Sequence, residues 1–199
     1  MSRVAALVLA AGASRRMGGP NKLLAELDGV SLVRRVVDAA LASRAAPVLV
    51  VTGHQDESVA ASLAGRDVAL RYNPDYSAGL STSLAAGIAA LPDDAEAVLV
   101  LLADMPFVTA AMLDRLIGAF EAGRPPPIVV PTHGGRRGNP VLWPRRCFAD
   151  LAAVEGDKGG RELIARQGDA VVTVEIGAAA STDIDTPEAL AEAGGRLSP

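Results

Sequence analysis

The sequence predicts an α/β fold built on a mostly parallel central sheet. Short apolar runs alternate with helical stretches along the first two thirds of the chain, which is typical of strand–helix–strand units. Half of the 199 residues are hydrophobic, as in a buried sheet covered by alanine-rich helices. The run AVLVLLAD (97–104) is the most continuous of the apolar runs, and it predicts a central strand buried on both faces.

The first strands and helices each have their own signal. Residues 4–9 form an apolar run that predicts the first strand, and Ser31 is expected to cap a helix that reaches about Arg44. Its apolar stripe consists of Leu32, Val33, Val36, Val37, Ala40 and Leu41, at the spacing of one helix face. Strands are expected at 47–52 and 68–73, with a helix over 57–63 between them. A helix over 81–91, weakened by Gly87, leads to the strand 97–104, and Thr109 caps a helix to about Phe120.

The alternation changes after the strand IVVP (128–131). HGGRRG (133–138) predicts a turn into NPVLWP, and short helices are expected near 144–154 and 159–166. AVVTVEI (170–176) is a late strand, and Thr186 followed by Pro187 begins the last helix. The end of the regular strand–helix alternation predicts an antiparallel strand or a small subregion after residue 131. The whole chain, residues 1–199, is expected to form one domain.

Composition excludes several classes of protein. A net charge of −4 and few aromatic residues argue against a nucleic-acid surface. No apolar segment reaches the ~20 residues that span a bilayer, so no membrane partner is expected. The single cysteine, Cys147, excludes an internal disulfide and a cysteine-based zinc site, and it is expected to be a small apolar helix residue.

The N-terminus MSRVAALVLAAGA has the outline of a signal peptide. Its charged region holds Arg3 alone, and cleavage would delete the best strand candidate in the chain. We therefore expect a soluble, cytoplasmic protein, with a signal peptide as the alternative.

Polar residues collect in the segments that follow the strands, where open α/β sheets bind their ligands. These segments are AAGASRRMGGPNK, TGHQD, NPDYSAGLSTS, DMP and DIDTP. In the first, Gly12, Gly18 and Gly19 allow backbone amides to approach an anion. Arg15, Arg16 and Lys22 add the positive charge that suits a triphosphate. The segment is neither a Walker A loop nor G-x-G-x-x-G, and a solvated surface loop is the alternative. Lys22 and Lys158 are the only lysines, each in a glycine-containing loop.

Three aspartates are candidate metal ligands. Asp104 ends the central apolar run, where a buried carboxylate needs a cation such as Mg²⁺; capping of the next turn is the alternative. Asp183 and Asp185 face the same way in extended backbone, although one of them could only cap the last helix. Ser81, Thr82 and Ser83 are expected at a helix N-terminus, where they suit an anion or nucleotide hydroxyls, or one of them caps the helix.

The remaining aromatic and imidazole side chains are assigned no chemistry. His54 and His133 lie in polar loops and are expected to be exposed and not catalytic. Tyr72, Tyr76 and Trp143 are expected to be packing residues, with Trp143 at the border of a second substrate as the alternative.

Six motifs, in order, resemble the MobA-like nucleotidyltransferase family, and especially its molybdenum cofactor cytidylyltransferase branch. They are LAAGASRRMGGPNKLL, NPDYSAGLSTSLAAGI, LLADMP, GNPVL, GDKGGRELI and DIDTPEAL. The resemblance covers nearly the whole chain and implies a Rossmann-like, GT-A-type, three-layer α/β/α sandwich.

The resemblance also implies a role for each matching residue. Nucleotide contacts are implied for Leu9, Ala10, Ala11, Gly12, Arg15, Arg16, Gly18, Lys22, Gly53, Asn73, Gly79, Ser81 and Ser83. Catalytic roles fall on Lys22, Asp104 and Arg15. Acceptor contacts fall on Asn139, Pro140, Asp157 and Lys158. Asp104 matches the Mg²⁺ ligand, and DIDTP supplies a second acidic position, at Asp183 or Asp185.

The implied reaction is Mg²⁺-dependent transfer of CMP from CTP to the phosphate of a molybdopterin-type molybdenum cofactor, with release of pyrophosphate. CTP is favoured because this chain has LAAG and NK, where guanylyl-transferring relatives usually have LAGG and DK. A transient contact with a molybdoenzyme or its chaperone is also implied. The alternatives are a guanylyltransferase, a sugar- or alcohol-phosphate nucleotidyltransferase, and a non-catalytic nucleotide-binding chaperone of the cofactor.

Overall fold

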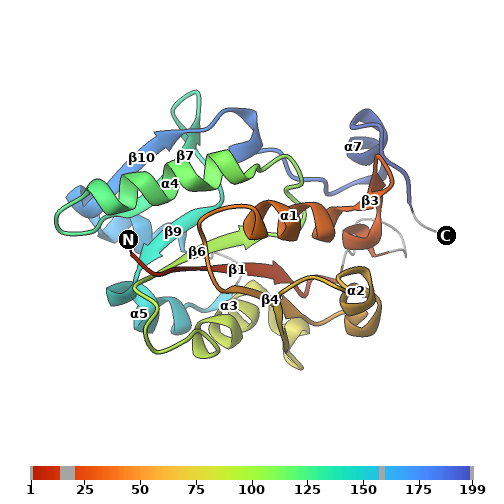
Figure 1. Ribbon diagram of the computed structural model, residues 1–199, viewed down its shortest axis with the longest axis horizontal. Helices are drawn as coiled ribbons and strands as arrows, with labels where there is room; N and C mark the ends of the chain where they lie inside the picture. Colours follow the sequence, from red (N-terminus) through yellow and green to blue (C-terminus); the bar gives the residue numbers. More distant parts are fainter. Residues whose placement is uncertain (1, 14–20, 157–159, 198–199) are drawn as a thin grey trace.

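A twisted, mostly parallel sheet forms the middle layer of the protein (Figure 1). The computed structural model describes residues 2–13, 21–156 and 160–197. The strand order is β10-β7-β9-β6-β1-β4-β5, with β8 paired to β7. The strands are β1 (Val4–Ala10), β4 (Val48–Thr52), β5 (Ala69–Tyr72), β6 (Ala97–Leu102), β7 (Ile128–His133), β8 (Arg136–Arg137), β9 (Val141–Pro144) and β10 (Val171–Glu175).

The prediction of a parallel sheet with one irregular region after residue 131 is confirmed. Strand β1 pairs in parallel with β4 and β6, β4 with β5, and β7 with β10. Strand β9 is antiparallel to both of its neighbours, β6 and β7. Strand β6 occupies the middle of this order, as its unbroken apolar sequence predicted.

Side chains of alternate strand residues build two cores, one on each face of the sheet. Val8, Val50 and Leu99 belong to the core under α1 (Leu32–Leu41), α2 (Asp56–Ser62) and α4 (Ala110–Ala122). Leu9, Val51 and Val98 belong to the core under α3 (Leu80–Ala89), α5 (Phe148–Ala152) and α6 (Arg161–Arg166). Because strand side chains alternate with a period of two, apolar residues at every position of β1 fill both cores. Figure 1 shows α1 and α4 on one side of the sheet and α3 and α5 on the other.

A third, smaller apolar cluster lies beyond the sheet edge and includes Leu27, Leu32, Ile184 and Leu190. It joins the hairpin of β2 (Glu26–Leu27) and β3 (Val30–Ser31) to α7 (Pro187–Glu192). The cluster therefore attaches the C-terminal segment with α7 to the β2–β3 hairpin and the start of α1.

Several local predictions need correction. Helix α1 ends at Leu41 rather than near Arg44, and the Ser31 side chain makes no capping hydrogen bond within the described residues. The N-cap of α3 is Gly79, so none of the hydroxyl residues that follow it is the N-cap. Tyr72 is 49% exposed rather than packed, because β5 is the outermost strand.

Other local predictions are confirmed. The Thr109 and Thr186 side chains accept hydrogen bonds from the backbone amides of Met112 and Ala189. Trp143 is buried, and so is Cys147, which ends the 3₁₀ turn η4 (Arg145–Cys147). Within the described part of the chain, no helix combines the length and the apolar character needed to span a bilayer.

Candidate functional site

Lys22 is fixed at the start of a short 3₁₀ helix, η2 (Lys22–Leu24), beside the carboxyl ends of β1 and β4. The side chain of Asn21 caps this turn by accepting a 3.0 Å hydrogen bond from the amide of Leu23. The Asn21 amide group also donates to the carbonyl oxygen of His54, at 3.4 Å. Both Asn21 and Leu23 are buried, so the backbone at Lys22 is held from two sides.

Asp104 lies two residues beyond the end of strand β6, at the carboxyl end of the middle strand of the sheet. The amide of Ala103 donates a 3.2 Å hydrogen bond to the carbonyl oxygen of Leu9 in β1, which continues the β1–β6 ladder to the edge. Ala103 is buried, whereas the Asp104 side chain is 19% exposed. The carboxylate thus lies at the rim of the sheet and not inside the core.

The segment DID (183–185) brings two further carboxylates to this edge. Ile184 is 1% exposed and packs into the third apolar cluster. Because neighbouring side chains in extended backbone point in opposite directions, Asp183 and Asp185 both face away from that cluster. Carboxylate oxygens of Asp104, Asp183 and Asp185 all lie within 4.8 Å of one another. We call these three residues the acidic cluster.

The ammonium group of Lys22 joins two members of the acidic cluster. Its Nζ atom donates a 2.6 Å hydrogen bond to Asp104 Oδ2 and a second hydrogen bond to Asp185 Oδ1. The Lys22 side chain is only 12% exposed. The opening loop and the acidic cluster therefore meet at one place, as the rule for parallel strand ends predicted.

The pKa directions reflect this crowding of charge. Burial opposes the charged form of Lys22, but the charges and hydrogen bonds of Asp104 and Asp185 outweigh it and raise the Lys22 pKa. Burial raises the pKa of Asp183, and the neighbouring carboxylates of Asp185 and Asp104 add to the rise, while Lys22 opposes it. One ammonium group thus leaves the acidic cluster negatively charged overall.

The donor set of the acidic cluster fits a divalent cation. Asp104 Oδ1 is buried and has no hydrogen-bond partner among the described residues. A buried carboxylate oxygen without a donor is costly, and a cation bound there would remove that cost. Three converging carboxylates supply the hard oxygen ligands that Mg²⁺ and Mn²⁺ accept.

Next to Lys22, the ends of β1 and β4 form a closely packed wall with Tyr76. Leu9, Ala10 and Ala11 are buried, whereas Gly12 is exposed. A Cβ atom on Gly53 would lie 2.6 Å from Tyr76 Cβ and 2.8 Å from Ala11 Cβ, so only glycine fits there. His54 is half-buried, with its ring 6.1 Å from the ring of Tyr76. The prediction that His54 is exposed is wrong, while His133 is exposed as predicted.

A buried polar network follows β5. The Asn73 amide group donates hydrogen bonds of 3.0 Å to Thr82 Oγ1 and to Ser83 Oγ, and its Oδ1 atom accepts one of 3.0 Å from the Asp75 amide. Asn73 is 3% exposed, and Ser81 and Ser83 are also buried. Asn73 therefore fixes the turn that leads through Gly79, where φ is +121°, into α3.

The segment GNP (138–140) packs against the residues that lead to the acidic cluster. The amide of Asn139 donates a 2.9 Å hydrogen bond to the carbonyl oxygen of Ala180, which ends the 3₁₀ turn η7 (Ala178–Ala180). A Cβ atom on Gly138 would overlap that same carbonyl oxygen. Pro140 is buried. The other expected site residues, Arg15, Arg16, Gly18, Asp157 and Lys158, lie outside the described residues.

Three residues were placed in sequence motifs, but their part in positioning the site was missed. Asn21 and Ile184 anchor the backbone beside Lys22 and between the two aspartates, and Gly138 permits the close approach of Ala180. For Ile184 the available signal was an isoleucine between two aspartates, because an apolar residue in a polar loop marks a buried anchor.

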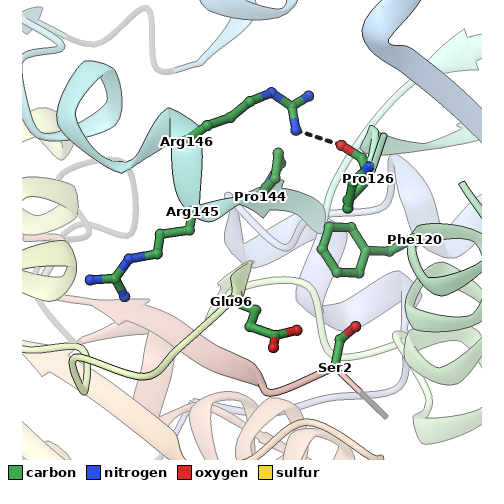
Figure 2. A pocket seen from close by; sticks show the side chains of 7 residues that line it. All are labelled: Ser2, Glu96, Phe120, Pro126, Pro144, Arg145 and Arg146. Atoms are coloured by element: carbon green, nitrogen blue, oxygen red, sulfur yellow. Dashed lines mark hydrogen bonds between the residues drawn. The ribbon is translucent and has the colours of Figure 1, made fainter. Parts of the chain in front are cut away.

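A cavity of about 320 Å³ lies near the amino ends of the central strands, away from the carboxyl ends that carry the acidic cluster (Figure 2). Ser2 and Glu96 line it and precede β1 and β6, so the cavity adjoins the amino ends of these strands. The other lining residues are Phe120, Pro126, Pro144, Arg145 and Arg146. Arg146 donates a hydrogen bond to the carbonyl oxygen of Pro126. This cavity is separate from the acidic cluster.

Relatives that share sequence with this chain include the following three. The molybdenum cofactor cytidylyltransferase of Escherichia coli (strain K12) is 27% identical over 190 residues, covering 94% of each chain. The purine catabolism protein PucB of Bacillus subtilis (strain 168) is 31% identical over 190 residues, covering 90% of each. The bifunctional protein GlmU of Sorangium cellulosum (strain So ce56) is 34% identical over 134 residues, which make up 64% of this chain and 28% of GlmU. The chain thus spans only about a quarter of GlmU.

Solved structures agree with a Rossmann-like three-layer fold. The Rv0371c homologue from Mycobacterium sp. strain JC1 is 29% identical with a TM-score of 0.81, over 96% of this chain and 94% of that one. Rv0371c from Mycobacterium tuberculosis H37Rv, in complex with manganese, is 25% identical with a TM-score of 0.77, over 96% and 98%. The model of the MobA-like NTP transferase domain matches residues 6–171, and the chain therefore belongs to this family of nucleotidyltransferases.

Proposed function

We propose that this chain transfers CMP from CTP to the phosphate group of a molybdopterin-type molybdenum cofactor. A phosphate oxygen of the acceptor attacks the α-phosphorus of CTP. The new P–O bond forms as the bond from the α-phosphorus to the bridging oxygen breaks, and pyrophosphate leaves. The observation that carries the proposal is the contact of Lys22 with Asp104 and Asp185, which places a cation from the glycine-containing loop beside a candidate metal site.

Each part of the site has a proposed task in this reaction. Gly12 and Gly53 would line the nucleoside pocket, and Lys22, with Arg15, Arg16 and Gly18, would hold the triphosphate. Asn139, Pro140, Asp157 and Lys158 would face the acceptor. Catalysis then rests on positioning and on neutralising charge. This is consistent with a site that offers lysine and aspartates rather than an activated nucleophile.

The acidic cluster would hold Mg²⁺ through Asp104, with Asp183 or Asp185 as a second ligand. When bound, Mg²⁺ would neutralise negative charge on the triphosphate. The buried, unpartnered Oδ1 atom of Asp104 among the described residues supports this assignment. So does the solved structure of Rv0371c from Mycobacterium tuberculosis H37Rv, which is a manganese complex.

Two observations favour CTP and the molybdenum cofactor within the family. The chain has LAAG at 9–12 and Asn21 before Lys22, where guanylyl-transferring relatives usually have LAGG and an aspartate. The Escherichia coli relative that is named a molybdenum cofactor cytidylyltransferase matches over 94% of both chains. The GlmU match covers less of this chain, and it favours a sugar-phosphate acceptor as the second candidate.

A panel of CTP, GTP, UTP and ATP, each with and without the molybdenum-bearing pterin, tests the proposal through release of pyrophosphate. We expect CTP with the pterin to give the highest kcat/KM. Faster turnover with a sugar phosphate would replace the proposed acceptor. Faster turnover with GTP would replace the proposed nucleotide, and no turnover with any pair would favour the binding chaperone.

Replacing Asp104 by Asn tests the metal assignment within this proposal. The substitution keeps the size of the side chain but removes its charge, and we expect pyrophosphate release to fall by at least about 100-fold. Asp114→Asn is the matched control, because Asp114 pairs with Arg44 on the outer side of α4. Equal rates in the two variants would contradict the assignment.

A further inference from the structure

We infer that Lys22 and a divalent cation exclude each other at the acidic cluster, so that Lys22 must leave Asp104 and Asp185 before the cation binds tightly. The inference rests on the proposed function, because it takes the acidic cluster as the metal site. It adds that the ammonium group of Lys22 occupies this site in the absence of the cation and is displaced when the cation binds.

The first reason is that the ammonium group and the cation need the same carboxylate groups. Lys22 Nζ donates to one oxygen of Asp104, at 2.6 Å, and to one oxygen of Asp185. A divalent cation binds carboxylate oxygens at about 2.0–2.6 Å, and its charge repels an ammonium group held at such short range. Asp104 Oδ1 is not bonded by Lys22, but one oxygen each of Asp104, Asp183 and Asp185 lie within 4.8 Å of one another. A cation held by these oxygens would therefore lie beside the ammonium group.

The second reason is that the lysine side chain can leave while its backbone stays. Asn21 and Leu23 hold η2 in place and are both buried, so the loop itself need not move. The Lys22 stem has four rotatable bonds that carry its compact charge. The glycine-containing loop that begins at Gly12 precedes Lys22 along the chain, so a bound triphosphate would offer the ammonium group new oxygen partners.

Exclusion of this kind couples the two ligands. A triphosphate that binds Lys22 frees the oxygens of Asp104 and Asp185, and a cation bound there frees Lys22 for the triphosphate. By linkage, each ligand then raises the affinity for the other by the same factor. The free protein should therefore bind a divalent cation weakly, and the metal should enter together with the nucleotide.

The test is the affinity of the nucleotide-free protein for Mn²⁺, measured by electron paramagnetic resonance. We expect Lys22→Met to bind Mn²⁺ at least about ten-fold more tightly than the unsubstituted protein, equivalent to about 1.4 kcal/mol. Arg66→Met is the matched control, because it also removes one positive charge from an ion pair, with Asp38, outside the acidic cluster. Equal or weaker binding by Lys22→Met than by Arg66→Met would overturn the inference.

Asp104→Asn separates this inference from the proposed function. If Asp104→Asn abolishes Mn²⁺ binding while Lys22→Met leaves it unchanged, the metal site stands and the exclusion is wrong. If Asp104→Asn binds Mn²⁺ as tightly as the unsubstituted protein, the proposed metal site fails, and the inference fails with it.

A second measurement needs no substitution at Lys22. The chain has two lysines, so ¹⁵N-lysine labelling gives two side-chain ammonium signals, which Lys158→Arg assigns. We expect saturating Mg²⁺ to shift the Lys22 signal and to speed exchange of its protons with water. A Lys22 signal that stays unchanged while Mg²⁺ binds would overturn the inference.

Discussion

The carbonyl oxygen of Asp104 accepts a 2.9 Å hydrogen bond from the backbone amide of Ile184. This bond joins the end of the central strand to a segment that is 80 residues further along the chain. Since Ile184 is also buried in the third apolar cluster, one residue fixes both the distance between the two segments and the direction of Asp183 and Asp185.

Truncating Ile184 should therefore weaken the site as well as the fold. We expect Ile184→Ala to cost about 2–4 kcal/mol of the free energy of unfolding, because it leaves a cavity in a buried cluster. Leu190→Ala is the control, since Leu190 is equally buried in the same cluster. Both variants should lose stability in urea titrations, but Ile184→Ala alone should lower the affinity for Mn²⁺. Parallel losses of metal affinity would contradict the special role of Ile184.

The close approach of Gly138 to Ala180 gives a second prediction. A methyl group at position 138 would overlap the Ala180 carbonyl oxygen, so Gly138→Ala should cost about 1–3 kcal/mol of the free energy of unfolding. It should also lower the affinity for Mn²⁺, because Ala180 leads directly to the acidic cluster.

Gly118→Ala is the control for that substitution. Gly118 lies inside α4, and its added Cβ would approach nothing nearer than Arg44 Nη2, at 3.7 Å. We expect this variant to gain about 0.5–1 kcal/mol, since alanine favours a helix over glycine. If Gly138→Ala were as stable as Gly118→Ala, the contact with Ala180 would not constrain the chain.

The position of Asp104 could be predicted from the sequence, whereas its partners could not. An unbroken apolar run must be a buried strand, and its first carboxylate must therefore lie at the sheet edge. The partners of Lys22 are 82 and 163 residues away in the chain, and no local pattern selects Asp104 Oδ2 or Asp185 Oδ1. That choice depends on the packing of Asn21 and Ile184.

The two wrong assignments among the aromatic and imidazole residues have the same physical cause. The alternation of side chains along a strand shows which residues of β5 share a face, but it does not show where β5 lies in the sheet. Because β5 is the outermost strand, Tyr72 is left half-exposed. His54 lies in a polar loop, but Tyr76 approaches its ring from another loop. Strand order and loop-to-loop contacts are tertiary properties that alternation and composition do not encode.

The ion pair between Arg44 and Glu121 gives a dependence of stability on pH. Arg44 Nη1 donates a 2.8 Å hydrogen bond to Glu121 Oε2, and this bond, more than any other contact, holds the pKa of Glu121 below its ordinary value of 4.5. A pKa that is lower in the folded protein stabilises it above pH 4.5, and the gain is lost as the pH falls through the lower, folded-state pKa. Glu121→Gln should therefore lower the melting temperature at pH 7, by less than about 3 °C for a surface pair.

The same measurement at low pH checks the sign. Once Glu121 is protonated in both the folded and the unfolded chain, the unsubstituted protein and Glu121→Gln should melt together. Glu155→Gln, at an exposed loop position, controls for the loss of one negative charge. A difference that grows as the pH falls would contradict the direction of the pKa shift.

Asn73 gives the last prediction, which separates positioning from direct contact with the base. Its side chain is buried and bonded to Thr82, Ser83 and the Asp75 amide. Asn73→Ala would leave these groups without their partner, at a cost of about 1–3 kcal/mol of the free energy of unfolding, and would loosen the first turn of α3. We expect a lower melting temperature and a higher KM for every nucleotide, with the ratio of kcat/KM between CTP and GTP unchanged.

If Asn73 instead contacts the base, that ratio should change while the melting temperature stays within about 1 °C. Thermal unfolding and the kinetics of the two nucleotides, measured on one preparation, decide between the two roles.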